Sequence, residues 1–501
     1  MLRKTFPAAL ALLLGGCTLI PDYSRPALPV ANQWPAGPAY DNQGPEGAAK
    51  ETGTPAAFIG WRTFFSDPVT ADLIGLGLTN NRDLRIAVAQ VDAMRAQFDV
   101  QHAGLFPTIS AGGNMDRQRE PAGLTRSPGA GPGEAVYTRG YGLGFGVSSY
   151  EVDLFGRIRS LSRSAFERYL SEDENRLGVQ ISLVANIATA YLTWLADRQA
   201  LQITADTVAN RQNAYRLIQL TMQRGTGTDE DVAQAEMALR EAEANNQQYT
   251  RQVARDLNQL QQLVGAPIPA ALQQRMLTVK SMEAADQFPP IPAGLPSDLL
   301  ERRPDILAAE HTLLAANANI GAARAAFFPT LTLTASGGTE SNSVANLFSA
   351  GTGAWSFAPQ ISVPIFDAGR NAANLDLAKA RKRQEIATYE KVIQTAFHDV
   401  ADALAGRGTY TDQLASQQGD VDASSRAYRI SMMRFQSGSD NYLNALVAQR
   451  SLYDAQIQLV NVRLQDLSNL ISLYKALGGG WTEHTKVEQA QQPGDAGRAP
   501  S

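Results

Sequence analysis

The chain has 501 residues, of which 44% are hydrophobic, and it carries a formal net charge of −5. Its length and apolar content suffice for a large core or several domains, and the mildly acidic balance gives no indication of a nucleic-acid partner. Beyond the N-terminus the sequence holds no run of about 18 apolar residues, so it predicts no membrane-spanning helix. A single cysteine excludes an intramolecular disulfide.

Residues 1–16 have the features of a secretory signal peptide, with a charged start at Arg3 and Lys4 and an apolar stretch behind it. The four residues that end in Cys17, Leu-Gly-Gly-Cys, resemble the lipobox of bacterial lipoproteins, in which the cysteine becomes the acylated first residue of the mature chain. An ordinary signal peptide with an incidental cysteine is the alternative. By the same resemblance, Thr18 after the cysteine favours the outer membrane. The lipidated segment 17–60 is rich in Pro, Gly and Ala and is expected to form an extended linker.

Residues 61–265 begin with a helix that is expected from Asp67 to about Ala103. A β-hairpin over about 106–150 follows, because its return strand alternates large apolar side chains with small ones. The alternating positions are Tyr137, Tyr141, Leu143, Phe145 and Val147 against Gly140, Gly142, Gly144, Gly146 and Ser148.

A long helical hairpin completes this first half, with its turn at 224–231. Residues 156–224 contain no proline and space their apolar residues as one helix does. A second helix is expected from Asp229 to Val264. A helix of about 65 residues would extend about 100 Å, which is too long for burial inside a compact domain.

The second half, residues 297–480, repeats this plan. A helix is expected from Ser297 to about Ala326, then a β-hairpin over about 328–366, then a long helical hairpin whose turn lies at 434–441. Two segments lie outside the repeated plan: the proline-rich inter-repeat segment 266–296, and a polar tail at 481–501 that is expected to be disordered.

The second hairpin carries the clearest strand signal. Each strand is about ten residues long, which suits a tilted strand that crosses a bilayer. One face is apolar and aromatic and the other is small and hydroxylated, as in a wall with lipid outside and water inside; a hairpin packed on a soluble core is the alternative. The apolar positions are Trp355, Phe357, Ile361, Val363 and Ile365, and the small or polar ones are Ser356, Ala358, Gln360 and Ser362.

Matched positions indicate an internal two-fold sequence repeat. They are Asp83 with Asp305, Pro107 with Pro329, Gly156 with Gly369, and Gly225 with Gly438. The first two pairs are offset by 222 residues and the last two by 213, so the loop of the first hairpin is 222 − 213 = 9 residues longer. The chain therefore has four membrane-type strands.

Four strands leave two unpaired sheet edges. Each unpaired backbone group in hydrocarbon costs several kcal/mol, so an open sheet cannot span a bilayer. A barrel needs at least about eight strands, so several chains must close it as a ring. The long helices would then form a second cylinder that extends the pore.

Several motifs resemble those of the TolC-like outer-membrane factors of tripartite efflux pumps, in particular the lipoprotein branch that serves resistance-nodulation-division (RND) transporters. They are YEVDLFGR at 150–157, LPSDLL at 295–300 with RPDI at 303–306, DNYL at 440–443 with AQRSL at 448–452, and YKALGGGW at 474–481.

The resemblance covers nearly all of the mature chain. It implies a mixed α and β membrane protein that forms a homotrimer in outer-membrane lipid. Its twelve-stranded β-barrel, four strands per protomer, would continue as a periplasmic α-helical coiled-coil barrel. A periplasmic adaptor protein and an inner-membrane RND pump would be the partners that open its closed inner tip.

The turns at 224–231 and 434–441 are the candidate periplasmic tips, with Gly225 and Gly438 as helix breakers. In the family, an aspartate at the position of Asp440 forms a ring at the aperture, where three like charges would resist closure and favour cations. An N-cap of the last helix is the plain structural alternative for Asp440. In the first half, Gly227 stands at the position equivalent to Asp440, and two acidic residues, Asp229 and Asp231, follow it. The sequence therefore leaves undecided which acidic residue of the first turn faces the pore axis.

Arg157 and Arg370 come directly after the return strands, and we expect them to mark the junction of barrel and helices; a surface salt bridge is the alternative. The four histidines have no metal-ligand spacing, and no phosphate loop or nucleophile elbow is present, so the sequence predicts no enzyme and no cofactor. The expected function is passive export of small molecules through the outer membrane. The alternatives are a type I protein-secretion conduit, a non-pore periplasmic coiled-coil lipoprotein, and a lipid-anchored hydrolase.

Overall fold

The computed structural model describes residues 18–40, 54–121, 135–282, 288–289, 291–292, 294 and 296–485. The predicted signal peptide and Cys17 lie outside the described residues.

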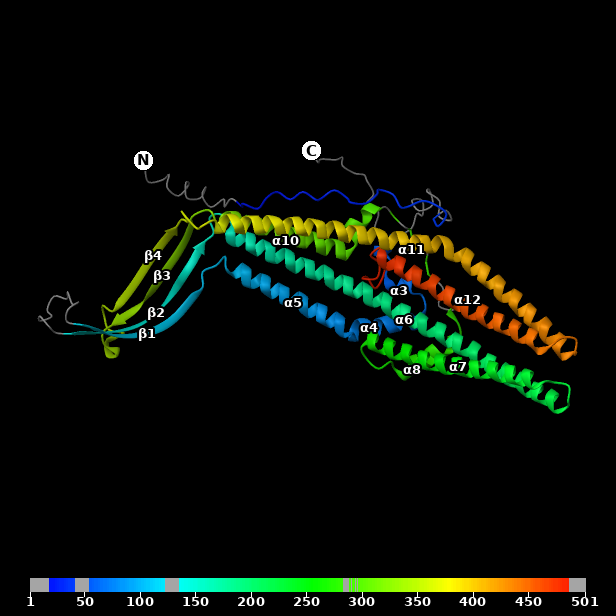
Figure 1. Ribbon diagram of the computed structural model, residues 1–501. Helices are drawn as coiled ribbons and strands as arrows, with labels where there is room; N and C mark the ends of the chain where they lie inside the picture. The colour runs from blue at the N-terminus through cyan, green and yellow to red at the C-terminus, as the bar shows by residue number, and fades with distance from the viewer. Residues whose placement is uncertain are drawn as a thin grey trace, which may run out of the picture. The chain divides into compact units, whose positions relative to one another are not determined.

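The elements of the first half begin with short helices and end with the long helical hairpin (Figure 1). They are η2 (Ala56–Phe58), α3 (Trp61–Phe64), α4 (Pro68–Asn80), α5 (Arg82–Ala103), β1 (Ile109–Glu120), β2 (Val136–Val152), α6 (Arg157–Gln223) and α7 (Asp229–Val264).

The later elements repeat the series after α8. They are α8 (Ala270–Thr278), η4 (Pro296–Asp298), α9 (Leu299–Arg302), α10 (Pro304–Ala325), β3 (Thr330–Ser341), η5 (Val344–Asn346), β4 (Gly353–Ser362), α11 (Arg370–Gln436) and α12 (Tyr442–Ala476). The return strand β4 is shorter than its alternating pattern, because Val363 and Ile365 lie beyond its end.

The element boundaries confirm the internal repeat. Both ends of α5 and α10 differ by 222 residues (304 − 82 and 325 − 103), and both ends of α6 and α11 differ by 213 (370 − 157 and 436 − 223). The starts of α7 and α12 also differ by 213 (442 − 229). The long helices α6 and α11 each contain 67 residues.

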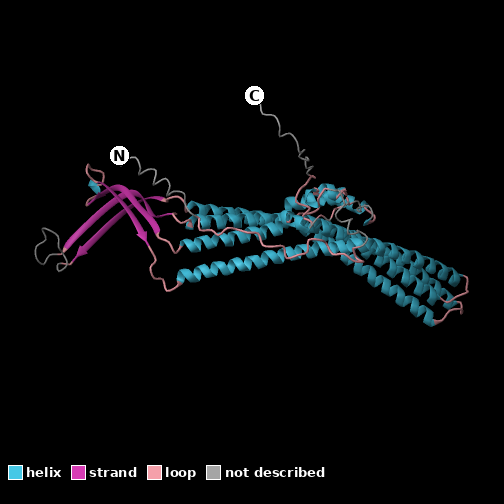
Figure 2. Cartoon of the chain, turned by 90° about the horizontal axis from the view of Figure 1, so that it is seen from above, coloured by secondary structure: helices cyan, strands magenta, loops and turns pink. Residues whose placement is uncertain are grey.

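The chain divides into two compact units, and neither coincides with one repeat. The described residues of the sheet unit fall within 18–26, 91–171 and 309–389, and those of the tip unit within 27–90, 172–308 and 390–485. Each unit takes segments from both halves of the chain. The sheet unit contains the four strands, which are drawn in magenta in Figure 2, and the tip unit contains both helical turns.

The strands form one antiparallel sheet in the order β1-β2-β3-β4. The register of β2 on β3 shifts between Val147 and Tyr150, where Ser149 has a φ of 57°. Such a bulge bends the strand and turns the following side chain. Here it brings the Tyr150 hydroxyl to donate to the carbonyl oxygen of Leu105 at 2.9 Å.

Each opening helix is broken where the sequence predicts continuity. The expected helix from Asp67 to Ala103 stops at Asn81, whose side-chain oxygen accepts from the backbone N–H of Leu84 and so begins α5. The expected helix from Ser297 stops at Arg303, before Pro304. The prediction was wrong at both points. A capping asparagine inside a periodic apolar stretch gives no separate signal, and at Arg303 the expected helix ran through Pro304, which cannot continue the preceding helix.

The two breaks are equivalent positions of the repeat, since 303 − 81 = 222. The Asn81 amide donates to the carbonyl oxygen of Leu263 at 2.8 Å, and the Arg303 guanidinium donates to that of Ala476 at 3.0 Å. Both acceptors lie in the last turn of a helix, where carbonyl groups lack helical partners. Each break therefore supports the end of α7 or α12.

The polar tail is ordered at its start. The backbone N–H of Trp61 donates to the carbonyl oxygen of Thr482 at 2.9 Å, and Arg62 pairs with Glu483. The expectation of disorder was therefore wrong for 481–485, because these residues pack on the chain around α3. Residues 486–501 lie outside the description.

Helix α6 contains an 18-residue window with a mean hydropathy of 1.4, which is apolar enough to cross a membrane by length and composition. Of that window, 67% is buried inside the fold, as in the core helix of a soluble body. The sequence predicted no membrane-spanning helix, and α6 is the helix among the described residues that passes the test of length and composition. Because most of the window is buried, it does not by itself indicate a span.

Candidate channel wall, junction and tips

One face of the sheet carries large apolar side chains in rows that cross all four strands. Two of these rows are Ile109 beside Val147, Ala335 and Phe357, and Ala111 beside Phe145, Gly337 and Trp355. Trp355 is 83% exposed and Phe357 is 60% exposed. Side chains this large and this exposed are expected where a sheet faces lipid or another protein.

The other face carries small and polar side chains at the alternate positions. Its rows include Ser110 beside Gly146, Ser336 and Ser356, and Gly112 beside Gly144, Gly338 and Ala354. The hydroxyls of Ser336 and Ser356 lie 2.7 Å apart and share a hydrogen bond. A cavity of about 450 Å³ lies along these rows. This face can border water, as the wall of a pore does.

The sheet is open at both sides. Among the described residues, β1 pairs only with β2 and β4 pairs only with β3. The outer edges of β1 and β4 thus present unpaired backbone groups, which a membrane does not tolerate.

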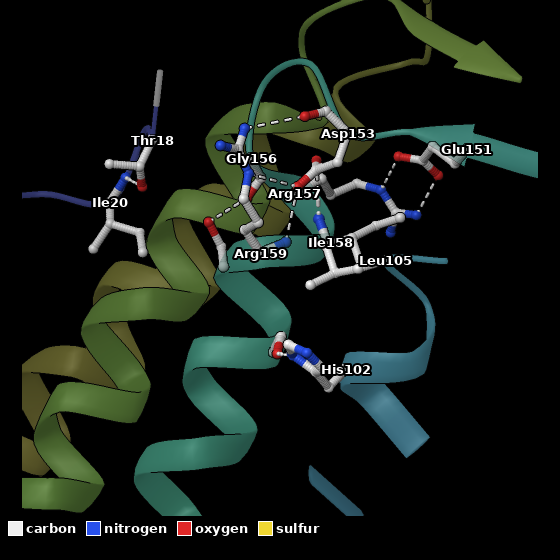
Figure 3. Close-up of polar contacts among 12 residues, drawn as sticks. Thr18, Ile20, His102, Leu105, Glu151, Asp153, Gly156, Arg157, Ile158 and Arg159 are labelled. Carbon is white, nitrogen blue, oxygen red and sulfur yellow. Dashed lines mark hydrogen bonds and ion pairs between the residues drawn. The ribbon is translucent and has the colours of Figure 1, made fainter. Parts of the chain in front are cut away.

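The junction between β2 and α6 is built from two carboxylates (Figure 3). Asp153 accepts from the backbone N–H of Ile158 at 3.2 Å and from that of Arg159 at 2.9 Å, and so caps the start of α6. Arg157 forms a two-pronged ion pair with Glu151 of β2. Its hydrogen bond to Glu151 raises the pKa of Arg157 despite partial burial. The salt-bridge alternative for Arg157 therefore describes the observed contact.

The second junction uses a cap of the same kind. Asp367 accepts from the backbone N–H of Asn371 at 2.9 Å and from that of Gly369 at 3.0 Å. Gly369 has a φ of +86°, a conformation that favours glycine. Arg370 is the first residue of α11 and its side chain is exposed. The capping role of both aspartates emerges only in the structure, although each stands two or three residues before a Gly-Arg pair.

The tips are two helical turns of matched geometry. Gly225 and Gly438 have φ values of +79° and +74° and end the long helices in the left-handed conformation. In the first turn Thr228 caps α7, and the Asp231 carboxylate in turn accepts from the backbone N–H of Thr228 at 3.1 Å. This capping box occupies Asp231 within its own turn. Asp229 is exposed at the start of α7.

In the second turn the N-cap of α12 is Asn441, so the N-cap alternative for Asp440 was wrong. Asp440 instead accepts from the backbone N–H of Asn441 at 2.9 Å and from the Asn444 amide at 2.8 Å, and it pairs with Arg434 at 3.5 Å. The hydrogen bond from Asn444 is the main cause that lowers the pKa of Asp440, followed by the Asn441 N–H. Asp440 is therefore ionised at neutral pH.

The first turn has no room for the same aspartate. A Cβ atom on Gly227 would lie 2.8 Å from the Thr221 hydroxyl and 2.9 Å from the backbone nitrogen of Met222. Contacts this short force the backbone to shift. The difference between Gly227 and Asp440 thus has a steric cause.

Side chains from both halves pack together behind the turns. The cluster is Ile218 of α6, Ala235 of α7, and Tyr442 and Ala445 of α12, with Met432 and Phe435 of α11 against it. The two turns therefore lie on one shared apolar core, and a change in one turn can reach the other.

Replacing Gly438 with alanine should destabilise the second turn by about 1–2 kcal/mol, because a side chain opposes the left-handed conformation. Hydrogen exchange of residues 434–442 should rise. The control is Gly419→Ala in the exposed middle of α11, where nothing lies within 4 Å of an added Cβ. That change should stabilise the helix by about 1 kcal/mol. Equal exchange in both variants would contradict the role of φ at the tip.

The segment that follows Cys17 is bound on α10 of the sheet unit, and we name residues 18–25 the N-terminal strap. The carbonyl oxygen of Leu19 accepts from Arg324 at 3.2 Å, and that of Pro21 accepts from Asn317 at 2.7 Å. Ile20 fills a notch that exists because residue 321 is a glycine; a Cβ there would lie 2.6 Å from the Ile20 side chain.

Glu310 fixes the far end of the strap. It accepts from Arg25 at 2.9 Å and 2.7 Å and from the Tyr23 hydroxyl at 3.0 Å. Arg25→Ala should cost about 1 kcal/mol, since the arginine is partly exposed, and should make residues 18–26 susceptible to protease. Arg62→Ala, which breaks another ion pair with an exposed arginine, should leave strap cleavage unchanged. A strap that stays resistant in Arg25→Ala would show that this ion pair does not hold it.

Comparison with known proteins identifies the family. The model of the outer membrane efflux protein family matches residues 73–266 and 295–479. The chain belongs to the outer membrane efflux protein family. The two matched segments correspond to the two repeats, and the family consists of channels.

Relatives agree over nearly the whole length. The chain is 48% identical over 479 residues to a toluene efflux pump outer membrane protein, TtgC, and to an antibiotic efflux pump outer membrane protein, ArpC, both of Pseudomonas putida. Each match covers 95% of this chain and 96% of the relative. The open state of the MtrE outer membrane channel of Neisseria gonorrhoeae is 36% identical, with a TM-score of 0.81 over 94% of this chain and all of that chain.

These matches confirm the predicted fold class, outer-membrane location and role as the channel component of an efflux system. The non-pore coiled-coil alternative was wrong, because the chain belongs to a family of outer-membrane efflux channels. Among the described residues, no group of three or more His, Cys, Asp or Glu is placed to hold a metal ion.

Proposed function

We propose that three copies of this chain close one continuous export channel in the outer membrane. The observation that carries this proposal is the four-stranded sheet with one apolar face, one small polar face and two open edges. Three such sheets, edge to edge, give twelve strands, and closure removes every unpaired edge. In such a trimer the polar rows face the pore and Trp355 and Phe357 face lipid.

Edge pairing can be tested with pairs of introduced cysteines. Cys17 is the only native cysteine, and in the proposed lipoprotein it is acylated, so no other thiol competes. One cysteine is placed on β1 and the second at successive positions of β4. Oxidation should give species of two and three chains in denaturing gels. The matched control is a pair at Val147 and Ala335, which are register partners within one chain and should cross-link only internally. If every pair on β1 and β4 gave only cross-links within one chain, trimer closure would be refuted.

The function extends to partners and cargo. The sequence predicts no nucleotide site, so the energy for export is expected to come from elsewhere. We infer a periplasmic adaptor and an inner-membrane RND pump that engage the tips. Relatives named for toluene and antibiotic efflux favour apolar organic cargo over exported proteins. Deletion of the gene should sensitise cells to such compounds, and the wild-type gene should restore resistance. Unchanged sensitivity together with loss of an exported protein would favour the secretion conduit.

The roles of three predicted sites belong to this proposal. The acyl group on Cys17 would enter the membrane next to the N-terminal strap, so the strap on α10 would fix the anchor to the protein body. Labelled palmitate should be incorporated by the wild type and not by Cys17→Ser. In the tip unit, Asp440 would contribute one charge per chain to the tip aperture, with Asp229 as the exposed acid of the first turn. Arg157 and Arg370 would mark the junction of barrel and helices, at the inner interface of the outer membrane.

A further inference from the structure

Two carboxyl groups meet between α6 and α7 in the tip unit, away from both turns. Asp256 of α7 is 4% exposed. Its Oδ1 accepts from the Gln252 amide at 3.0 Å, whereas its Oδ2 is buried and receives no hydrogen bond from the described residues. The side chain of Asp197 of α6 lies within hydrogen-bonding reach of Asp256. A buried carboxylate oxygen without a donor is costly, so the site lacks a proton donor.

Asp197 is set up to supply that proton. Burial raises its pKa, and the hydrogen bond and charge of Asp256 raise it further, to about 7, while Gln252 acts in the opposite direction. Two neighbouring carboxylates cannot both ionise without repulsion, so Asp197 keeps its proton at pH values below about 7.

The surrounding groups do not neutralise the pair. From α7, Tyr249 lies near Asp197, and both burial and the charge of Asp197 raise its pKa. From α12, Tyr453 faces Tyr249, and burial is the main cause that raises its pKa to about 12. Arg198, next to Asp197 in the chain, directs its guanidinium to backbone carbonyl oxygens at and beyond the end of α8.

We propose that Asp197 and Asp256 form a proton-sensitive latch between α6 and α7. One shared proton joins the two carboxyl groups and holds the helices together, and its release to water leaves two negative charges that push them apart. These helices lead directly to the first turn at Gly225, whose core they share with α12. The latch therefore lets periplasmic pH set how firmly the tip hairpin is packed, a regulation that goes beyond the export function itself.

The sign of the dependence of hairpin stability on pH follows from the linkage between proton binding and folding. The pKa of Asp197 is higher in the folded protein than in the unfolded chain, so the native state binds the extra proton between about pH 4 and pH 7. The stabilisation is complete below the unfolded pKa and is lost as pH rises through the folded value. The hairpin should therefore be tightest in acid and loosest in mild alkali.

The test is hydrogen exchange of the full-length assembled protein, compared at pH 6 and pH 8.5 after correction for intrinsic exchange rates. Wild-type residues 190–205 and 245–262 should lose protection several-fold at the higher pH. Infrared spectroscopy should show a protonated carboxyl band at pH 6 that disappears with a midpoint near 7. Asp197→Asn should keep the protection at both pH values and should lack that band.

A matched control distinguishes the latch from any loss of surface charge. Asp206 of α6 accepts from Gln202 at 3.0 Å in the same i, i+4 arrangement as Asp256 with Gln252, but it is exposed. Asp206→Asn should retain the full pH response. A response that persists in Asp197→Asn and Asp256→Asn, or that is absent from the wild type, would overturn the latch. A midpoint that moves strongly with added Mg²⁺ would make the pair a cation site and would also overturn it.

Discussion

Asp440→Ala should increase the frequency or size of channel openings several-fold in a planar bilayer. In the resting turn the Asp440 carboxylate joins three groups, the Asn441 N–H, the Asn444 amide and the Arg434 guanidinium. Alanine removes all three contacts, and a trimer loses them three times. In the proposed trimer this turn lies at the aperture, so its loosening should favour opening. Single-channel conductance of the purified trimer measures the effect directly.

Two further variants separate charge from turn geometry. Asp440→Asn keeps a side-chain acceptor but removes the charge, so it should reduce cation preference more than it increases opening. Glu230→Ala removes an exposed acid from the first turn, where Glu230 accepts a hydrogen bond from the Gln234 amide at 3.2 Å, and should change little. Equal conductance in Asp440→Ala and the wild type would retain the channel and move the gate away from this turn.

The pH dependence of the same turn has the opposite sign to that of the latch. The pKa of Asp440 is lowered in the folded state, so its contribution is present at neutral pH and is lost as pH falls through the lowered value. Wild-type openings should therefore become more frequent below about pH 4, and those of Asp440→Ala should not. A recording in mild alkali tests Asp197 and Asp256 instead, so the two effects are separable.

Much of this architecture could be predicted because its signals are local. The ends of α7 at Asp229 and Val264 are encoded by flanking glycines, and the lengths of α6 and α11 follow from the absence of proline. The alternation around Phe357 indicated both sheet faces before the register was known. The equal offsets between repeats then fixed the number of strands.

The parts that sequence could not supply depend on contacts between distant segments. Asn81 is an ordinary polar residue in the sequence, and only its contact with Leu263 shows why the helix breaks there. Neighbouring Asx residues, Asp440 and Asn441, are equally good caps, and the backbone decides between them. Asp197 and Asp256 meet only because α6 and α7 turn particular faces toward each other. The spacing of apolar residues in the sequence does not show which faces these are.

Phe357→Arg should prevent stable trimer formation. Phe357 lies in the middle of β4, on the apolar face, in a row with Ala335, Val147 and Ile109. An arginine on the lipid face of a barrel costs about 2–4 kcal/mol near the bilayer centre, and each trimer would carry three. The yield of folded trimer in outer-membrane fractions and its melting temperature in detergent report the loss.

The control is the neighbouring residue on the same strand. Ser356→Arg places the same side chain on the small polar face, where Ser356 shares a hydrogen bond with Ser336. Water in the pore can solvate that guanidinium, so the trimer should form, with a narrower and less cation-selective channel. If both variants assembled equally well, the apolar face would not be in contact with lipid. If only Ser356→Arg failed, the two faces would be exchanged, and the pore would lie on the side that carries Trp355.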